Sequence, residues 1–224
     1  MVRIMMPNFM KLTLCTILGT VLLLGGCAAP QKASEGKNRF FWPKPELSEP
    51  RVEFIGAYGS RDDFEKTKAQ IASEAFLGKD NLLPFKGPFA TVADDEGLVF
   101  VTDVYDKNIR VYDFNRKKIS FLLQKTFLQR PYDLAMDAKK NIYVADAELG
   151  RIFVLSREGQ NLYSFGNPEL LPQPVYLEIN ERLQRLYVSD SKKNKIVVFD
   201  LNTKKFLFDF GDRGTNPGFF LSCQ

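Results

Sequence analysis

An all-β fold built from repeated four-stranded sheets is the fold class that this sequence predicts, and a recurring pattern is the first reason. Each repeat opens with a proline, at Pro88, Pro131 and Pro174, and these prolines are spaced 43 residues apart. Each repeat also carries a Val-x-Asp triplet, which ends at Asp103, Asp146 and Asp190, at intervals of 43 and 44 residues. A period of this size, filled with short strands, is typical of a β-propeller blade.

The strands expected within one repeat are the second reason. In the middle repeat, short apolar stretches alternate with turn residues, which predicts strands over 133–137, 141–145, 151–156 and 161–165. No helix-length segment separates them, so a βαβ arrangement is excluded, and a β-sandwich would not require so constant a period. The sequence therefore predicts an incomplete propeller of about three blades and the start of a fourth. The expected blades are 88–130, 131–173 and 174–216, within a propeller region of 88–224.

Residues 51–87 are expected to hold a strand and one N-terminal helix that lead into the first blade. The apolar stretch 51–58 resembles the last strand of the later repeats, so we expect it to complete the last blade of a closed ring, a blade that this chain does not contain. A helix is expected over about 62–77, because Ser60 can cap it and acids follow in its first turn. Phe64, Ile71 and Phe76 fall near one face of this helix, which is expected to pack on the blades.

The first 27 residues have the features of an export signal rather than of the fold. Basic residues precede an apolar run of 13 residues, 12–24, which is short for a membrane span but suits a signal-peptide core. The run ends in Leu24-Gly25-Gly26-Cys27, which resembles a bacterial lipobox. That resemblance implies cleavage before Cys27 and attachment of lipid, including palmitate, to this cysteine. The alternative is an uncleaved transmembrane anchor.

Residues 28–50 are polar and contain four prolines, so they are expected to form an extended tether between membrane and domain. Phe40-Phe41-Trp42 interrupts the tether and is expected either to dock on the domain or to touch the bilayer interface. Ala28, rather than aspartate, follows Cys27, and the lipoprotein resemblance then implies the periplasmic side of the outer membrane if the cell is Gram-negative. The expected location is the bacterial cell envelope, with the membrane as a partner through the lipid.

Charge and cysteine content argue against a nucleic-acid-binding protein and against a disulfide-stabilised one. The formal net charge of +4 falls to +2 once Arg3 and Lys11 leave with the leader, and no basic stripe remains, so nucleic acid is not an expected partner. Cys15 lies in the leader and Cys223 is next to the last residue, so no disulfide framework is expected.

The repeats resemble the NHL repeat, which is found in six-bladed propellers. The residues that carry this resemblance run from Asn141-Ile142-Tyr143-Val144-Ala145-Asp146 through Gly150-Arg151-Ile152-Phe153-Val154-Leu155, with matching copies at 98–112 and 185–199. The resemblance covers 88–211 and implies a fold much more than an activity, because one propeller fold hosts many functions.

The repeated aspartates are interpreted as structural rather than catalytic. Asp103, Asp146 and Asp190 each end a strand, where a carboxylate can accept hydrogen bonds from the backbone of the following turn. The polar positions left near the blade starts, where the resemblance places a propeller's binding surface, are Tyr132, Asp133, Tyr176 and Glu178. Aromatic rings beside carboxylates suit a peptide or a glycan, although the tyrosines can equally serve as packing between blades.

The absence of histidine from all 224 residues excludes a Ser-His-Asp triad, a Cys-His pair and an imidazole metal site. The favoured hypothesis is a non-enzymatic envelope lipoprotein that acts as a binding scaffold for an unknown protein or glycan partner, with no cofactor and no metal. The alternative, which a resemblance to gluconolactonase-like propellers implies, is a hydrolase or lactonase that holds calcium through oxygen ligands such as Asp133, Glu178 and Asn180.

Three repeats do not close a ring, because closed propellers use about four to eight blades. Three explanations are considered. The chain is a truncated product, which is the favoured one; or two copies close a six-bladed ring as a dimer; or a partner covers a stable arc of three blades.

Overall fold

The computed structural model describes residues 40–42, 52–54, 56–59, 63, 64, 66, 68–77 and 84–221. It divides the chain into two compact units, 1–56 and 57–224. The expected signal peptide, Cys27 and Cys223 lie outside the described residues. Among the residues described, none of the helices has the length and apolar character that crossing a membrane requires.

The first unit contains one small antiparallel pair. Strand β1 (Phe40–Trp42) pairs with β2 (Val52–Phe54), with Phe41 opposite Glu53. The partner of β2 in this structure is the aromatic triplet of the expected tether, and the expectation that the stretch completes a blade absent from this chain stays a prediction. The indole of Trp42 is 71% exposed.

The second unit holds three four-stranded antiparallel sheets, each with its strands in chain order. The first sheet consists of β3 (Pro88–Ala93), β4 (Leu98–Asp103), β5 (Asn108–Asp113) and β6 (Lys118–Phe121). The second consists of β7 (Pro131–Met136), β8 (Ile142–Asp146), β9 (Arg151–Leu155) and β10 (Asn161–Phe165). The third consists of β11 (Pro174–Asn180), β12 (Arg185–Asp190), β13 (Lys195–Asp200) and β14 (Phe206–Phe210).

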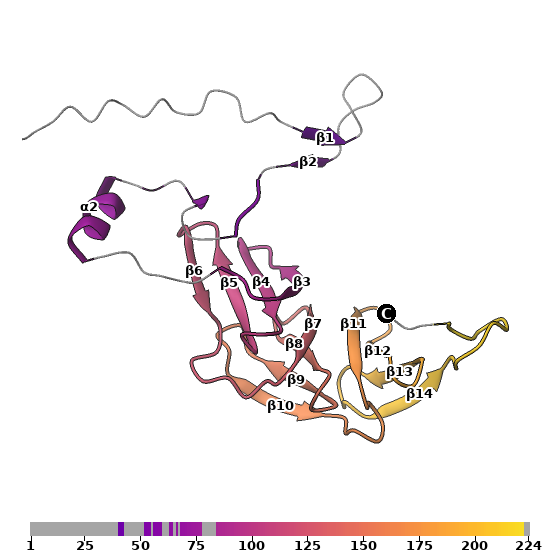
Figure 1. The fold of residues 1–224 in the computed structure, drawn as a ribbon. Coiled ribbons are helices and arrows are strands. Elements are labelled where there is room, and N and C mark those ends of the chain that lie inside the picture. The colour runs from indigo at the N-terminus through magenta and orange to yellow at the C-terminus, as the bar shows by residue number, and fades with distance from the viewer. Residues whose placement is uncertain are drawn as a thin grey trace, which may run out of the picture. The chain divides into compact units, whose positions relative to one another are not determined.

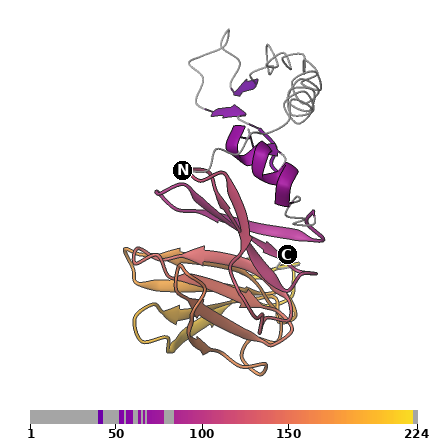
Figure 2. The same cartoon turned by 90° about the vertical axis from the view of Figure 1, so that its left-hand side faces the viewer.

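These sheets follow one another as the blades of a propeller (Figures 1 and 2). The first strand of the middle sheet, β7, contacts both β3 and β11, so the first strands of the three sheets lie side by side. Sheets that are joined last strand to first, with their first strands adjacent, form a β-propeller arc. The predicted all-β fold with three four-stranded blades is confirmed.

Apolar side chains fill the two junctions between the blades. Between the first and second blades, Phe100 and Ile109 pack with Ile142 and Val144, and all four side chains are fully buried. A second cluster joins the second blade to the third and includes Ile152, Val154, Leu186, Val188 and Phe199. Because the second blade offers both faces of its sheet to these clusters, burial of apolar area holds the arc together.

The remaining face of the first blade is covered by aromatic residues that precede it in the chain. Phe64 is buried against Tyr112, and Tyr58 and Phe85 pack on the same cluster. The ring of Phe85 stacks on that of Tyr112, with 5.8 Å between their centroids.

The N-terminal helix is shorter and less buried than expected. Helix α2 covers Lys68–Leu77, whereas the sequence predicts a start near residue 62. Ile71 and Phe76 are exposed, Phe76 to 94%, so the predicted packing of the apolar helix face on the blades is wrong. The reason is that Phe64, which comes before the helix begins, makes the contact with the first blade instead.

Beyond β14, residues 211–221 form a turn that is closed by a bridge between Arg213 and Phe220. Gly211 has a φ of 91°, and the ring of Phe220 lies so close that a Cβ at this position would clash with it. Within the described residues, this stretch adds no further strand to the third sheet.

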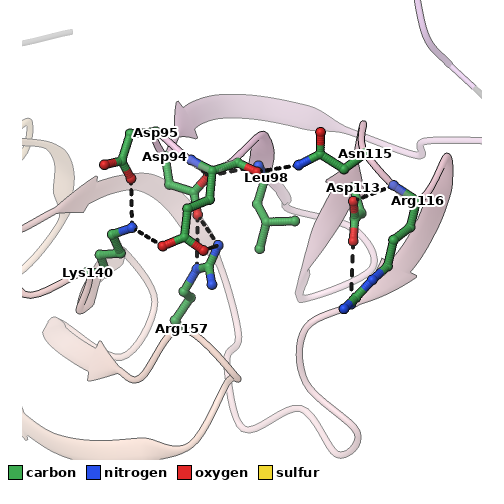
Figure 3. Close-up of polar contacts among 9 residues, drawn as sticks. Asp94, Asp95, Leu98, Asp113, Asn115, Arg116, Lys140 and Arg157 are labelled. Atoms are coloured by element: carbon green, nitrogen blue, oxygen red, sulfur yellow. Dashed lines mark hydrogen bonds and ion pairs between the residues drawn. The ribbon is translucent and has the colours of Figure 1, made fainter.

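Charged turns also join the first blade to the second (Figure 3). The buried carboxylate of Asp94, in the turn between β3 and β4, accepts hydrogen bonds from Arg157 Nε at 2.9 Å and from Arg157 Nη2. Lys140 pairs with Asp95 at 2.6 Å and with Glu96. Burial raises the pKa of Asp94, but hydrogen bonds from the Leu98 amide and Arg157 outweigh it and hold this pKa below its ordinary value.

We expect the variant Arg157→Ala to lower the free energy of unfolding by about 2 kcal/mol at pH 7, because it leaves the buried Asp94 carboxylate without its charged donor. A carboxyl whose pKa is lowered by folding contributes stability above its unfolded pKa of about 4, and this contribution is lost as the pH falls further. The loss measured by urea unfolding should therefore shrink between pH 5 and pH 3.

The matched control is Arg116→Ala, which removes a guanidinium that is 84% exposed and lies 3.7 Å from Asp113. Such surface pairs contribute little, so we expect a change below about 0.5 kcal/mol at either pH. Equal losses in the two variants would show that the Asp94 contact does not join the blades.

Candidate functional site

The four residues that the sequence places near the blade starts come together with a fifth, Phe89. We call these five residues the axial cluster; its members are Phe89, Tyr132, Asp133, Tyr176 and Glu178. They lie on β3, β7 and β11, the first strands of the three blades. Because these strands are neighbours, side chains from three distant parts of the sequence converge on one surface.

The rings of the axial cluster are in direct contact. Phe89 meets Tyr132 edge to face, with 4.6 Å between ring centroids and 80° between planes, and its centroid lies 6.1 Å from that of Tyr176. Phe89 is 47% exposed and Tyr176 is 41% exposed, whereas Tyr132 is half-buried. The rings therefore pack between blades and still offer apolar surface to solvent.

The aromatic ring of the cluster does not stand at the same distance from the opening proline in every blade, and each blade has a register shift after that proline. In each blade one extra residue separates the proline from the regular pairing of the first two strands, as between Pro131 and Leu134 in β7. Such a bulge changes which side chains face the neighbouring strand. Phe89 and Tyr132 both directly follow their proline, whereas the corresponding residue in the third blade is Val175 and the ring there belongs to Tyr176.

Asp133 ties two blades together at this surface. Its carboxylate accepts hydrogen bonds from the Leu134 amide at 2.8 Å and from the Leu177 amide, on β11, at 2.7 Å. Burial raises the pKa of Asp133, the two amides oppose this, and the nearby charge of Glu178 raises it further. Glu178 is exposed, so it is the carboxylate of the cluster that is accessible to a ligand.

Thr102 links the backbones of two strands that carry the cluster, β3 and β7. Its side chain is fully buried, and its hydroxyl donates to the Tyr132 carbonyl at 2.8 Å and accepts from the Ala90 amide at 3.0 Å. These bonds fix the backbone of β7 against β3 beneath the rings of Phe89 and Tyr132. Exposed aromatic rings on a fixed backbone, next to a carboxylate, can stack on a sugar ring or bind a basic or aromatic side chain.

Sequence reasoning did not single out Phe89, although a signal for it was present. Phe89 follows Pro88 as Tyr132 follows Pro131, so aligning the repeats on their prolines puts the two rings at the same position. The contact between them depends on the adjacency of β3 and β7, which only the fold supplies.

The three repeated aspartates occupy a different place and are fully buried. Asp146 accepts hydrogen bonds from the amides of Glu148 and Leu149 in the following turn, and also from those of Gln129 and Arg130, which lead into β7. Asp103 and Asp190 make corresponding bonds in the first and third blades. Each carboxylate thus joins a turn to the start of its own blade, a link that the sequence analysis did not foresee.

Within the described residues, no group of three or more carboxylate, histidine or cysteine side chains is arranged to hold a metal ion. The oxygen ligands considered for calcium, Asp133, Glu178 and Asn180, lie on β7 and β11, and Asn180 Oδ1 accepts a hydrogen bond from the Leu183 amide at 2.9 Å.

Comparison with known proteins gives matches in structure alone. No protein-family model matches the chain, and no curated protein shows significant similarity to it in sequence. Solved structures that are similar include a catalytically inactive virginiamycin B lyase from Staphylococcus aureus with quinupristin, at 15% identity and a TM-score of 0.47. This match covers 59% of the present chain and 43% of the lyase chain.

Two further solved structures are similar to a comparable extent. A nidogen/laminin complex matches at 22% identity and a TM-score of 0.46, over 58% of this chain and 49% of the other. Hydrazine synthase from Kuenenia stuttgartiensis matches at 17% identity and a TM-score of 0.47, over 63% of this chain and 39% of the synthase chain. The chain thus spans less than half the length of these three matching chains.

Proposed function

We propose that this protein is an envelope lipoprotein, anchored through lipid on Cys27, whose NHL-type propeller binds a protein or glycan partner and catalyses no reaction. The observation that carries the binding role is the axial cluster, where three rings in contact stay partly exposed beside the carboxylate of Glu178. The anchor is supported by the lipobox-like Leu24-Gly25-Gly26-Cys27 after an apolar run.

The expected mode of binding follows from the chemistry of the cluster. Phe89 and Tyr176 offer flat apolar surface at low cost in side-chain entropy, and Glu178 offers an acceptor for a hydroxyl, an amide or a cation. Since the rings are held by neighbouring blades, the surface is formed before the partner arrives, which lowers the ordering cost of binding.

We expect the full-length protein to incorporate a palmitate analogue, since a lipobox cysteine carries acyl chains. Cells that express the wild-type chain are fed a clickable palmitate analogue, and the label on the purified protein is measured. The variant Cys27→Ala should lose the label entirely. The control Cys223→Ala, which removes a cysteine outside the leader, should keep it. An unlabelled wild-type protein would overturn the anchor.

The binding role is tested with a photo-crosslinking residue at position 176 of the full chain in living cells. We expect a discrete crosslinked species that weakens about tenfold when Glu178→Gln and Phe89→Ala are introduced, because truncating a central aromatic contact costs about 1–2 kcal/mol. The control places the crosslinker at position 105, where Tyr105 is 73% exposed and outside the cluster. Identical products from positions 176 and 105 would contradict a binding role for the axial cluster.

A further inference from the structure

The turns at the other end of β7 form a polar pocket between the second and third blades, away from the axial cluster. Its volume is about 230 Å³, and its wall includes Asp137, Tyr143, Tyr163, Glu181 and Lys204. Pockets for drug-sized ligands have volumes of about 300–1,000 Å³, so this one suits a smaller molecule.

The corresponding place between the first and second blades also holds a pocket, of about 330 Å³, but its wall includes a guanidinium, that of Arg157. Asp94 and Asp137 hold the same position in successive blades, and each uses Oδ1 to accept two amides of its own turn, Glu96 and Leu98 in one case and Lys139 and Asn141 in the other. Asp94 Oδ2 then receives the guanidinium of Arg157.

At the second junction the cation is replaced by neutral donors. Asp137 Oδ2 accepts Asn141 Nδ2 at 2.9 Å and the Tyr143 hydroxyl at 3.3 Å. The residue of the third blade that corresponds to Arg157 is Leu201, which is buried in the apolar core. The charge of Asp137 is therefore hydrogen-bonded without an ion pair among the described residues, and Asp137 lies in the wall of the pocket.

The pocket also presents a cation on one side. Lys204 Nζ lies 4.8 Å from the ring centroid of Tyr143 and 5.5 Å from that of Tyr163, and it donates to the Tyr143 hydroxyl and the Leu201 carbonyl. An ammonium group has three donors, so one remains. Burial raises the pKa of Tyr143, which keeps this hydroxyl protonated as a donor to Asp137.

The carboxylate of Glu181, also in the pocket wall, can accept further hydrogen bonds. Its Oε1 accepts the Ala138 amide at 2.7 Å, and its Oε2 accepts Gln184 Nε2 at 3.1 Å, so each oxygen keeps a lone pair. The pocket wall thus combines two carboxylates with an ammonium group that retains a free donor.

We propose that this pocket binds a small zwitterion, such as a free α-amino acid, with its ammonium group at Glu181 and Asp137 and its carboxylate at Lys204. A ligand that carries both charges satisfies both sides of the pocket, whereas a simple amine or a simple acid leaves one side unpaired. The ring of Tyr163, which is 40% exposed and lies in the pocket wall, supplies the apolar contact for its carbon atoms. This site is separate from the axial cluster and does not depend on the function proposed there.

The test uses the full-length protein and saturation-transfer NMR with L-alanine as the probe. We expect saturable binding of L-alanine, and at least tenfold weaker binding of ethylamine and of acetate, each of which carries one of the two charges. Equal binding of ethylamine or acetate, or no saturation by L-alanine up to about 50 mM, would overturn the proposal.

Two variants locate the binding in the pocket. Glu181→Gln and Lys204→Gln should each weaken L-alanine binding at least tenfold, with far-UV circular dichroism and the unfolding midpoint as checks of folding. The matched controls Glu169→Gln and Lys205→Gln remove a carboxylate and an ammonium group outside the pocket wall and should bind as wild type does. Undiminished binding in both folded pocket variants would place the alanine elsewhere and refute the assignment.

Discussion

Replacing Asp146 with alanine is expected to lower the free energy of unfolding by about 3–5 kcal/mol. The carboxylate is fully buried and accepts hydrogen bonds from four amides, those of Gln129, Arg130, Glu148 and Leu149, at 2.7–3.1 Å. Leaving one buried amide without an acceptor costs about 1–3 kcal/mol, and alanine supplies no replacement.

The loss should extend beyond the turn itself, because the bonds to residues 129 and 130 hold the start of the blade to the end of β8. We therefore expect the variant to unfold at a lower urea concentration and the start of β7 to lose protection in amide hydrogen exchange. Urea unfolding monitored by far-UV circular dichroism measures the first effect, and exchange mass spectrometry measures the second.

Asp113→Ala is the matched control for this prediction. Asp113 also ends a central strand, but its carboxylate accepts one amide, that of Arg116 at 2.8 Å, at an exposed turn. Water can replace this acceptor, so the expected loss is below about 1 kcal/mol. If Asp146→Ala were no more destabilising than Asp113→Ala, the repeated aspartates would not be central to the blade.

The structure agrees best with the sequence-based predictions in the segments of the chain that repeat. The prolines and the Val-x-Asp triplets recur, and with them the turns and strands recur, so the three sheets follow from a local pattern read three times. The axial cluster was predicted in part for the same reason, since Tyr132, Asp133, Tyr176 and Glu178 lie near blade starts that the period locates.

The features that occur once were harder to predict. The pairing of β1 with β2 joins two short stretches that no period relates, and the exposure of Phe76 depends on Phe64 taking the place of the helix against the first blade. The charge environment of Asp137 likewise depends on a difference between blades, with Leu201 at the position of Arg157. Deviations from a repeat can be seen in a sequence, but their consequences depend on which blades become neighbours.

Arg110 is another residue at which one repeat differs from the others. Its replacement by methionine is expected to lower the free energy of unfolding strongly. It stands in β5 where the other blades have Phe153 and Val197, and its side chain is only 1% exposed. The guanidinium donates to Asp106 at 2.6 Å and to the Pro84 carbonyl at 3.0 Å.

The aromatic surroundings of Arg110 add to its stabilising role. Its guanidinium carbon lies 4.5 Å from the ring centroid of Phe85 and 5.3 Å from that of Phe121, within the range of a cation–π contact. Methionine fills much of the same volume but removes the charge next to the buried carboxylates of Asp103 and Asp106. Breaking a buried ion pair in this way costs about 3–5 kcal/mol, and we expect about 3 kcal/mol at pH 7.

The pH dependence separates this electrostatic cost from a packing defect. Burial raises the pKa of Asp106, but hydrogen bonds from Lys86 and Arg110 outweigh it and hold this pKa below its ordinary value. The stability that Asp106 contributes is therefore present above its unfolded pKa of about 4 and is lost as the pH falls through the lower, folded value. The difference between wild type and Arg110→Met should shrink from pH 7 to pH 3, because protonation of Asp106 removes the charge that Arg110 helps to stabilise.

Arg185→Met is the control that isolates burial. Arg185 also lies over an aromatic ring, with its guanidinium carbon 5.4 Å from the centroid of Phe208, but it is part-exposed and is the first residue of β12. We expect a loss of at most about 1 kcal/mol that does not change between pH 7 and pH 3. If Arg110→Met behaved in the same way, the first blade would owe its stability to the aromatic contacts of Phe64 and Phe85, and the buried cation would be dispensable.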